Sequence, residues 1–213
     1  MNRVPLFVCF LTLFNLTLFG QSGETPKVVR NAENSAIHVP PQVAPAGLTV
    51  IYTNLGKKGD LYNCCGFILS GPNSAFGSVF TAMPFTPKSN SHISDVRVAV
   101  QYSSGANQIN LSIYDDSGGV PGTLLAGPVT VTNLPDTDTC CLLAVAAFTP
   151  TAVSAGAQYW VVANTPLTGV GSDFYGTWEK AGKVIPFAVN RGSSWFAGSA
   201  DVLPAGEVLG TVP

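Results

Sequence analysis

Adjacent carboxylates are the first residues in this sequence that could carry out chemistry. Asp115 and Asp116 stand side by side ahead of the turn-forming residues Ser117, Gly118 and Gly119. Hard cations such as Ca²⁺ take grouped carboxylate and carbonyl oxygens as ligands, so the pair is a candidate calcium site. The alternative is that both side chains accept hydrogen bonds from nearby backbone N–H groups in a turn. The turn interpretation is favoured, and no cofactor is expected, calcium being the one exception left open.

An enzyme built on this sequence would also depend on its carboxylates. A glycosidase needs two of them at a defined separation in a cleft, and no spacing in the sequence selects two. The carboxylates considered are Asp115, Asp116, Asp173, Glu179 and Asp201. A histidine base for nucleophilic catalysis is equally hard to find, because His38 and His92 belong to no recognisable triad. The sequence therefore predicts a non-enzyme. The alternative is an extracellular carbohydrate-active hydrolase or lyase using carboxylates near Asp115 and Asp116 or Glu179.

Aromatic residues in the Gly-rich C-terminal third are candidates for binding. Tyr175, Trp178 and Trp195 could stack their rings against sugar faces while neighbouring amides bond the hydroxyls. The alternative is that these rings fill the ends of a hydrophobic core. Alternation along a strand also places one of Tyr159 and Trp160 in the core and the other on the opposite face.

The N-terminus indicates export. A cationic start, an apolar stretch over residues 4–19 and small residues over 20–23 are typical of a secretory signal peptide, here residues 1–22. The apolar stretch is shorter than the ~20 apolar residues of a membrane span, and no later stretch is longer, so the mature chain is expected to lack one. A Pro-rich leader over residues 23–48 and a single domain over residues 49–213 follow. The expected location is bacterial and secreted, either extracellular or periplasmic.

Cysteine usage agrees with an oxidising compartment. Beyond the signal peptide the chain has two adjacent pairs, Cys64–Cys65 and Cys140–Cys141, which are expected to form disulfides. Adjacent Cα atoms lie about 3.8 Å apart, closer than the usual disulfide range of roughly 4.4–6.8 Å, so a bridge within a pair needs strain. Bridges between the pairs are favoured, although they require irregular backbone because successive strand side chains point to opposite faces. Bridging within each pair remains the alternative.

Composition restricts the partners. Charged residues make up 10% of the chain and hydrophobic residues 46%, which is the reverse of a disordered sequence. The 10 Lys and Arg against 12 Asp and Glu provide no basic surface for nucleic acid. A surface of amides and hydroxyls suits a neutral polysaccharide or another cell-surface or matrix component. The expected function is a non-catalytic module that associates with such a surface and binds carbohydrate weakly.

The predicted elements are short strands. Within residues 93–102, Val96, Val98 and Val100 share one face and Arg97 and Ala99 the other, which predicts a half-buried strand with Arg97 at the surface. The alternation resumes over residues 108–113 after a Ser/Gly turn and predicts a hairpin. Further strands are predicted over residues 50–55, 77–85, 123–126, 129–134, 140–148, 158–164 and 185–189. Gly and Pro separate these strands and no helical period appears. The predicted class is all-β, an antiparallel two-sheet sandwich, jelly-roll-like, with very little helix.

Two motifs in this pattern resemble a known family. The turn from Ser117 to Gly122, Ser-Gly-Gly-Val-Pro-Gly, and the strand from Gly156 to Val161, Gly-Ala-Gln-Tyr-Trp-Val, are similar to those of bacterial choice-of-anchor domains. The resemblance covers roughly residues 76–164. It implies an exported, jelly-roll-like β-sandwich with no established catalytic residues. The C-terminal residues 208–213 show no sorting anchor of the kind that such proteins carry, so the mature protein is expected to be exported and soluble, or held to a surface only by non-covalent contact.

Overall fold

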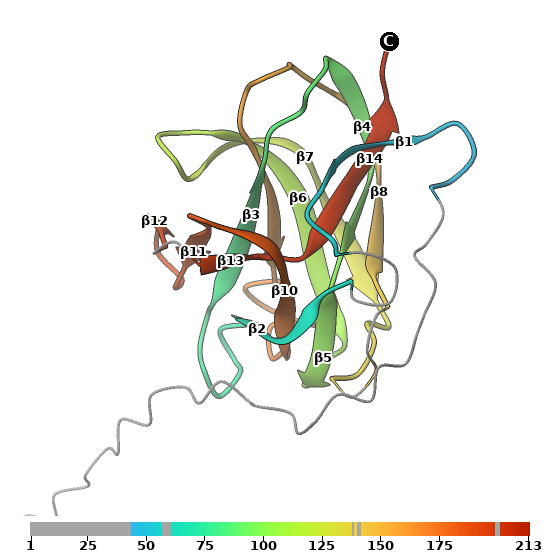
Figure 1. The fold of residues 1–213 in the computed structure, drawn as a ribbon. Coiled ribbons are helices and arrows are strands. Elements are labelled where there is room, and N and C mark those ends of the chain that lie inside the picture. The colour runs from blue at the N-terminus through green and yellow to red at the C-terminus, as the bar shows by residue number, and fades with distance from the viewer. Residues whose placement is uncertain (1–43, 57–60, 138, 140–141, 199–200) are drawn as a thin grey trace, which may run out of the picture.

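The computed structural model describes residues 44–56, 61–137, 139, 142–198 and 201–213 (Figure 1). The predicted signal peptide lies outside the described residues, as do most of the leader and Cys140 and Cys141. The described residues form fourteen β-strands, and no helix among them is long and apolar enough to cross a membrane. The strands are β1 (Thr49–Thr53), β2 (Asn63–Ser70), β3 (Phe80–Phe85), β4 (Ser91–Val98), β5 (Val100–Ser104), β6 (Gln108–Asp116), β7 (Pro121–Thr132), β8 (Ala144–Val153), β9 (Tyr159–Asn164), β10 (Tyr175–Ile185), β11 (Ala188–Asn190), β12 (Trp195–Ala197), β13 (Asp201–Pro204) and β14 (Gly206–Thr211).

The strands form three antiparallel sheets. The largest has six strands in the order β12-β11-β3-β9-β6-β7. A second has the order β1-β14-β4-β8, and a third has the order β13-β10-β2, with β5 also paired to β10. In Figure 1 the β1-β14-β4-β8 sheet lies at the upper right, with β2 and β5 below it. Consecutive strands repeatedly change sheet, as they do in a jelly roll.

Two single residues join the two smaller sheets into one layer. Ala99 separates β4 from β5, and Ala205 separates β13 from β14, so each chain segment passes from one sheet to the other. The Ala99 N–H donates to Ala205 O at 3.0 Å, and the Ala205 N–H donates to Glu179 O at 2.7 Å. These bonds continue the pairing across the break. The joined layer packs against the six-stranded sheet around one main hydrophobic core, which confirms the predicted antiparallel β-sandwich.

The predicted hairpin between residues 93–102 and 108–113 is wrong. β5 pairs with β10 in the smaller layer, whereas β6 pairs with β7 and β9 in the six-stranded sheet. The Ser/Gly turn therefore carries the chain from one sheet to the other. Val98 and Leu111 are both fully buried in the main core, which they enter from opposite sheets. Two strands that face the same core from opposite sheets show the same alternation as two strands paired in one sheet. The sequence pattern alone could therefore not distinguish these two arrangements.

The prediction that residues 93–102 form a half-buried strand is also wrong, because both faces are covered. Ala99 is 0% exposed and belongs to a second cluster with Leu61, Tyr62, Leu143, Ala181 and Ala205, on the side away from the main core. Arg97, expected at the surface, is 3% exposed and pairs with Glu207 at 3.1 Å. Arg191, by contrast, is exposed. The buried ion pair connects β4 to β14, which are neighbours in the sheet.

The predicted strands 123–126 and 129–134 are one strand, β7. It runs from Pro121 to Thr132 and passes through a cis peptide bond between Gly127 and Pro128. Its register with β6 shifts in several places, which lets the bent strand stay paired with β6. β7 lies at one edge of the six-stranded sheet and is exposed along most of its length.

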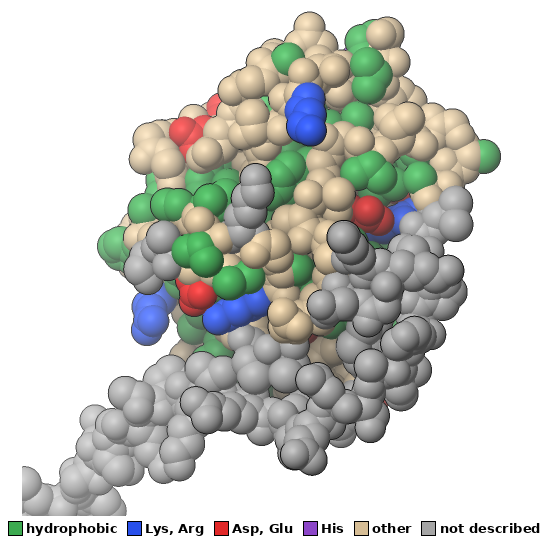
Figure 2. Space-filling model, viewed as in Figure 1, with side chains coloured by type: hydrophobic (Ala, Val, Ile, Leu, Met, Phe, Trp, Pro, Cys, Tyr) green, Lys and Arg blue, Asp and Glu red, His purple; other side chains and the backbone are tan. Residues whose placement is uncertain are grey.

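Charge is sparse on the surface of the sandwich. Figure 2 shows few Lys, Arg, Asp and Glu side chains on one face, among many more atoms of uncharged side chains and backbone. This agrees with the 10% share of charged residues in the chain. Uncharged side chains and backbone therefore make up most of the surface in this view.

Candidate functional site

The six-stranded sheet carries a third hydrophobic cluster, on the face away from the main core. Along β9, Val161 and Ala163 point into the main core, whereas Trp160 and Val162 point to the opposite face. We call this third cluster the outer cluster: Ala82, Trp160, Val162 and Ala188, with Tyr114, Val120 and Trp195 packed against it. Tyr159 lies on the core side, where its ring stacks on Phe85 at 5.7 Å between centroids. Trp160 is thus the member of the Tyr159–Trp160 pair that faces away from the core, yet it is only 1% exposed.

Asp116 organises the loop at the edge of the outer cluster. Its Oδ1 accepts hydrogen bonds from Trp160 Nε1 at 2.8 Å and from Gln158 Nε2 at 2.7 Å. Its Oδ2 accepts from the Gly119 N–H at 3.2 Å. The neighbouring Asp115 accepts a hydrogen bond from the Thr123 N–H. Both aspartates therefore accept backbone N–H bonds as the turn interpretation describes, and Asp116 in addition fixes the Trp160 ring.

Calcium at Asp115 and Asp116 stays a prediction. Among the described residues, no group of three or more His, Cys, Asp or Glu side chains is arranged to hold a metal ion. A calcium ion at this loop would need backbone carbonyls or water for most of its six to eight ligands.

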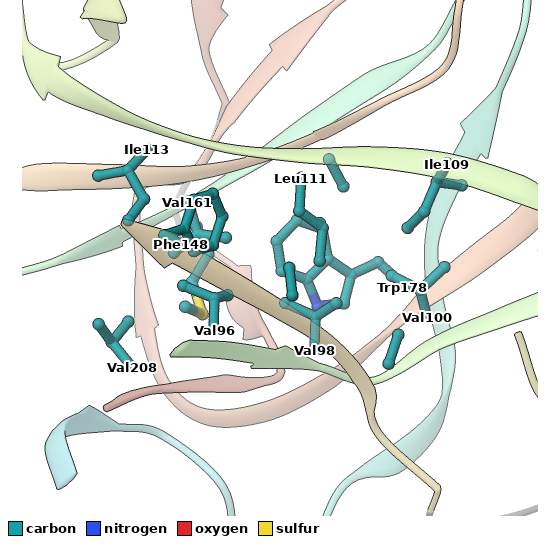
Figure 3. Close-up of a cluster of buried hydrophobic side chains, with 14 of the residues drawn as sticks. Val96, Val98, Val100, Ile109, Leu111, Ile113, Phe148, Val161, Trp178 and Val208 are labelled. Carbon is teal, nitrogen blue, oxygen red and sulfur yellow. The ribbon is translucent and has the colours of Figure 1, made fainter. Parts of the chain in front are cut away.

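Trp178 is a core residue, which corrects its prediction as a binding residue. It is 0% exposed and lies among Val98, Val100 and Leu111 in the main core (Figure 3). Its Nε1 donates to Ala205 O at 2.8 Å, next to the break between β13 and β14. A ring enclosed in this way has no face available to a sugar.

Tyr175 lies at one end of the sandwich, apart from the outer cluster. Its ring packs on that of Phe76, with 4.6 Å between centroids, and partial burial raises the pKa of the Tyr175 phenol. The loop before β10 bonds to the loop after β2 here, where the Asn73 N–H donates to Ser172 O at 2.9 Å. Phe76 is 44% exposed, so this aromatic pair meets solvent.

Trp195 is the predicted binding residue that belongs to the outer cluster. It lies on β12, directly opposite Asn190 of β11, and is half-buried. Asp116 and Trp195, predicted for unrelated reasons, thus border the same cluster. Tyr114 on β6 is a further member that sequence reasoning missed. Burial of its ring raises the pKa of the Tyr114 phenol.

The remaining carboxylates named for catalysis have structural partners. Glu179 is 3% exposed, and its Oε1 accepts a hydrogen bond from Thr177 Oγ1 at 2.7 Å. Asp173 accepts from the Ala106 N–H at 3.1 Å, and Asp201 pairs with Lys180 at 3.2 Å. Asp173 and Asp201 therefore connect separate segments of the chain, whereas the bond of Glu179 lies within β10.

Three asparagines line up across the outer face of the six-stranded sheet. Asn110 of β6 lies directly opposite Asn164 of β9, and Asn190 of β11 lies opposite Phe80 of β3. The register of β3 with β9 aligns Phe80 with Asn164, so the three side chains fall in one line. We call Asn110, Asn164 and Asn190 the amide row; Thr130 stands opposite its β7 end and Trp195 opposite its β12 end. Asn110 lies on the polar side of the alternation over residues 108–113, but nothing in the local sequence connects it to Asn164 and Asn190.

The first cysteine pair lies at an irregularity in β2. Asn63 is opposite Lys180 and Phe67 is opposite Trp178, so β2 advances four residues over the stretch in which β10 advances two. This is the irregular backbone that bridging between the pairs was expected to require. Cys140 and Cys141 lie outside the described residues, and the description of Cys64 and Cys65 stops at the backbone.

Comparisons with protein-family models, with curated proteins and with solved structures found no match.

Proposed function

We propose that this chain is an exported, non-catalytic β-sandwich module that associates with a neutral polymer of a bacterial cell surface or matrix. The resemblance to choice-of-anchor domains supports the exported, jelly-roll-like class. Attachment in this proposal is non-covalent, and weak carbohydrate binding is the molecular activity.

The distribution of charge carries the proposal. Residues 117–172 contain only two charged side chains, Asp136 and Asp138. This stretch includes β7, β8 and β9, and the exposed residues of β7 and β8 are Thr, Leu, Val, Ala, Pro and Gly. A strongly charged polymer would find few complementary groups on these strands, whereas a hydroxyl-rich neutral polymer needs only amides, hydroxyls and aromatic faces.

Disulfide bridges between the two cysteine pairs are part of the proposal. The described residues next to the pairs approach each other: Tyr62 Oη donates to Leu142 O at 3.1 Å, and Leu143 packs in the cluster of Leu61 and Tyr62. Each bridge forms when two thiols transfer two electrons and two protons to an external disulfide oxidant, which leaves as two thiols. The bridges would close loops of about 75 residues and contribute roughly 4 kcal/mol in the chain-entropy description.

Peptide mapping without reduction tests the bridges. We expect the peptide with Cys64 and Cys65 to be recovered linked to the peptide with Cys140 and Cys141. Separate recovery of the two peptides, with thiols free or bridged within each pair, would contradict the proposal.

A glycan array tests the function itself. The exported protein is applied with calcium and again with a chelator. Neutral polysaccharides should bind above the level of acidic ones under at least one condition, and loss of binding with the chelator would favour the calcium site at Asp115 and Asp116. Silence of all neutral glycans in both conditions would remove the carbohydrate-binding activity.

A further inference from the structure

The amide row has hydrogen-bond donors that the protein orients and does not use. Asn190 Oδ1 accepts from the Gly192 N–H at 2.7 Å, and Asn110 Oδ1 accepts from Thr130 Oγ1 at 3.0 Å. Each bond fixes the carbonyl oxygen and thereby turns the NH₂ group the other way. Within the described part of the chain these two NH₂ groups have no acceptor. Both asparagines are half-buried, so their side chains reach solvent with little freedom left to lose on binding.

The middle asparagine provides the complementary group. Asn164 Oδ1 is buried and has no hydrogen-bond partner among the described residues, although the residue as a whole is half-buried. An amide oxygen kept from water without a donor costs free energy. A small rotation of the side chain that met a ligand hydroxyl would remove this cost. The row therefore has two donors with an acceptor between them.

An aromatic ring closes one end of the row, and small or apolar residues line one side of it. Trp195 closes one end with a half-buried indole, and Phe80 separates Asn164 from Asn190. On one side of the row, small outer-face residues lie on facing positions of five strands: Ser112, Val162, Ala82, Ala188 and Ala197. Neither the row residues nor these five neighbours are charged, and Arg191, the exposed residue after Asn190, is the cation next to the row in the chain. Amides can exchange hydrogen bonds with sugar hydroxyls, and an aromatic ring face can pack on sugar C–H groups.

We propose that the amide row, with Trp195 at its end, is a binding site for a neutral, hydroxyl-rich polysaccharide chain lying across the strands of the six-stranded sheet. Asn110 and Asn190 donate to sugar oxygens, Asn164 accepts from a sugar hydroxyl, and the Trp195 ring packs on a C–H face. This site rests on the proposed function and names where that function resides. It replaces Trp178 and Tyr175, which lie elsewhere in the fold.

Affinity electrophoresis of the exported protein tests the site. The gels contain hydroxyethylcellulose, xylan, mannan or soluble starch as neutral polymers, and dextran sulfate as a charged one. We expect the wild type to be retarded by at least one neutral polymer. The double variant Asn110→Ala/Asn190→Ala should bind that polymer about thirtyfold more weakly, because it loses two donors that together contribute roughly 2 kcal/mol. Trp195→Ala should weaken binding by a similar factor.

Phe196→Ala is the matched control. Phe196 is the next residue of β12, it is 55% exposed, and it points to the other face of the strand, opposite Val189. This variant should bind as the wild type does, and all variants should keep the wild-type unfolding midpoint to within a few degrees. If the wild type binds a neutral polymer and the row variants bind equally well, the site is wrong and the proposed function stands. If only dextran sulfate retards the protein, or no polymer does, both are wrong.

Discussion

Burial separates the roles of the three tryptophans. Trp178 is 0% exposed and Trp160 is 1% exposed, whereas Trp195 is half-buried. Trp178→Ala should lower the free energy of unfolding by about 3–5 kcal/mol, because it leaves a large cavity in the main core and removes a bond to Ala205 O. Urea unfolding measures the change, and Phe196→Ala should stay within about 0.5 kcal/mol of the wild type. A free energy of unfolding of Trp178→Ala equal to that of the wild type would contradict the assignment of Trp178 to the core.

The buried ion pair should behave differently when one partner or both are removed. Arg97→Met leaves Glu207 buried without its cation and should cost about 3–5 kcal/mol in the free energy of unfolding. Arg97→Met combined with Glu207→Leu should recover much of that loss, since apolar groups of similar volume replace both charges. Urea unfolding of the single and double variants measures the difference. Equal destabilisation by both would show that the pair stabilises the protein through more than its mutual contact.

Sequence reasoning found residues of chemical interest without assigning them correctly. Asp116 and Trp195 lie at the outer cluster, whereas Trp178 lies in the core and Tyr175 at one end of the sandwich. Residue type and local alternation indicate which side chains could bind a sugar. Burial depends on what packs over each residue, and that comes from strands distant in the sequence.

At the scale of the element, Asn54 connects the end of β1 to three other strands. Its Nδ2 donates to Pro204 O at 2.8 Å and to Ala181 O at 3.3 Å, and its Oδ1 accepts from the Gly206 N–H at 2.8 Å. Asn54→Ala should cost about 2–3 kcal/mol, because it removes three hydrogen bonds and leaves partly buried backbone groups unpaired. Thermal and urea unfolding measure the loss. A change below about 0.5 kcal/mol would mean that solvent replaces these bonds at no cost.

The pairing of β10 with β13 should weaken in acid. The Val202 N–H holds the pKa of Asp201 below its ordinary value, and Lys180 acts in the same direction. Because the folded-state pKa is lowered, the stabilisation is present above the unfolded pKa of about 4 and is lost as the pH falls through the folded value. Asp201→Asn should therefore reduce stability at pH 7 and leave it unchanged at the lowest pH. The effect stays within about 0.2–1 kcal/mol, since the Asp201 side chain is 46% exposed. A wild type and variant that differ equally at every pH would contradict this origin.

Most strands could be predicted from the sequence, but their partners could not. The alternation over residues 93–102 and 108–113 correctly marked β4, β5 and β6, and the inward valines and isoleucines do line the core. β10 was missed because Glu179 and Lys180 interrupt its apolar positions; Glu179 accepts a hydrogen bond from Thr177 of the same strand, and Lys180 pairs with Asp201 of β13. The amide row could not be predicted either, since it depends on the adjacency of β6, β9, β3 and β11.

At the scale of the whole molecule, the joined layer and the six-stranded sheet differ in the features that they carry. The joined layer contains the buried ion pair of Arg97 and Glu207, the irregular pairing of β2 with β10, and the strand breaks at Ala99 and Ala205. The six-stranded sheet carries the outer cluster on the face away from the main core, where Trp160 and Val162 are buried, and the half-buried amide row lies beside it. In the function that we propose, the sandwich positions the amide row for weak binding to a neutral polymer, so that its side chains lose little freedom on binding.

Quenching of tryptophan fluorescence by acrylamide tests the central claim most directly. Trp160 and Trp178 are shielded by burial, so the quenchable emission comes from Trp195, and Trp195→Phe should abolish most of it. The account predicts that the neutral polysaccharide that retards the protein will also protect Trp195 from quenching, and that Asn110→Ala/Asn190→Ala will lose this protection. Quenching of Trp195 that is unchanged at saturating polysaccharide would contradict binding at the amide row.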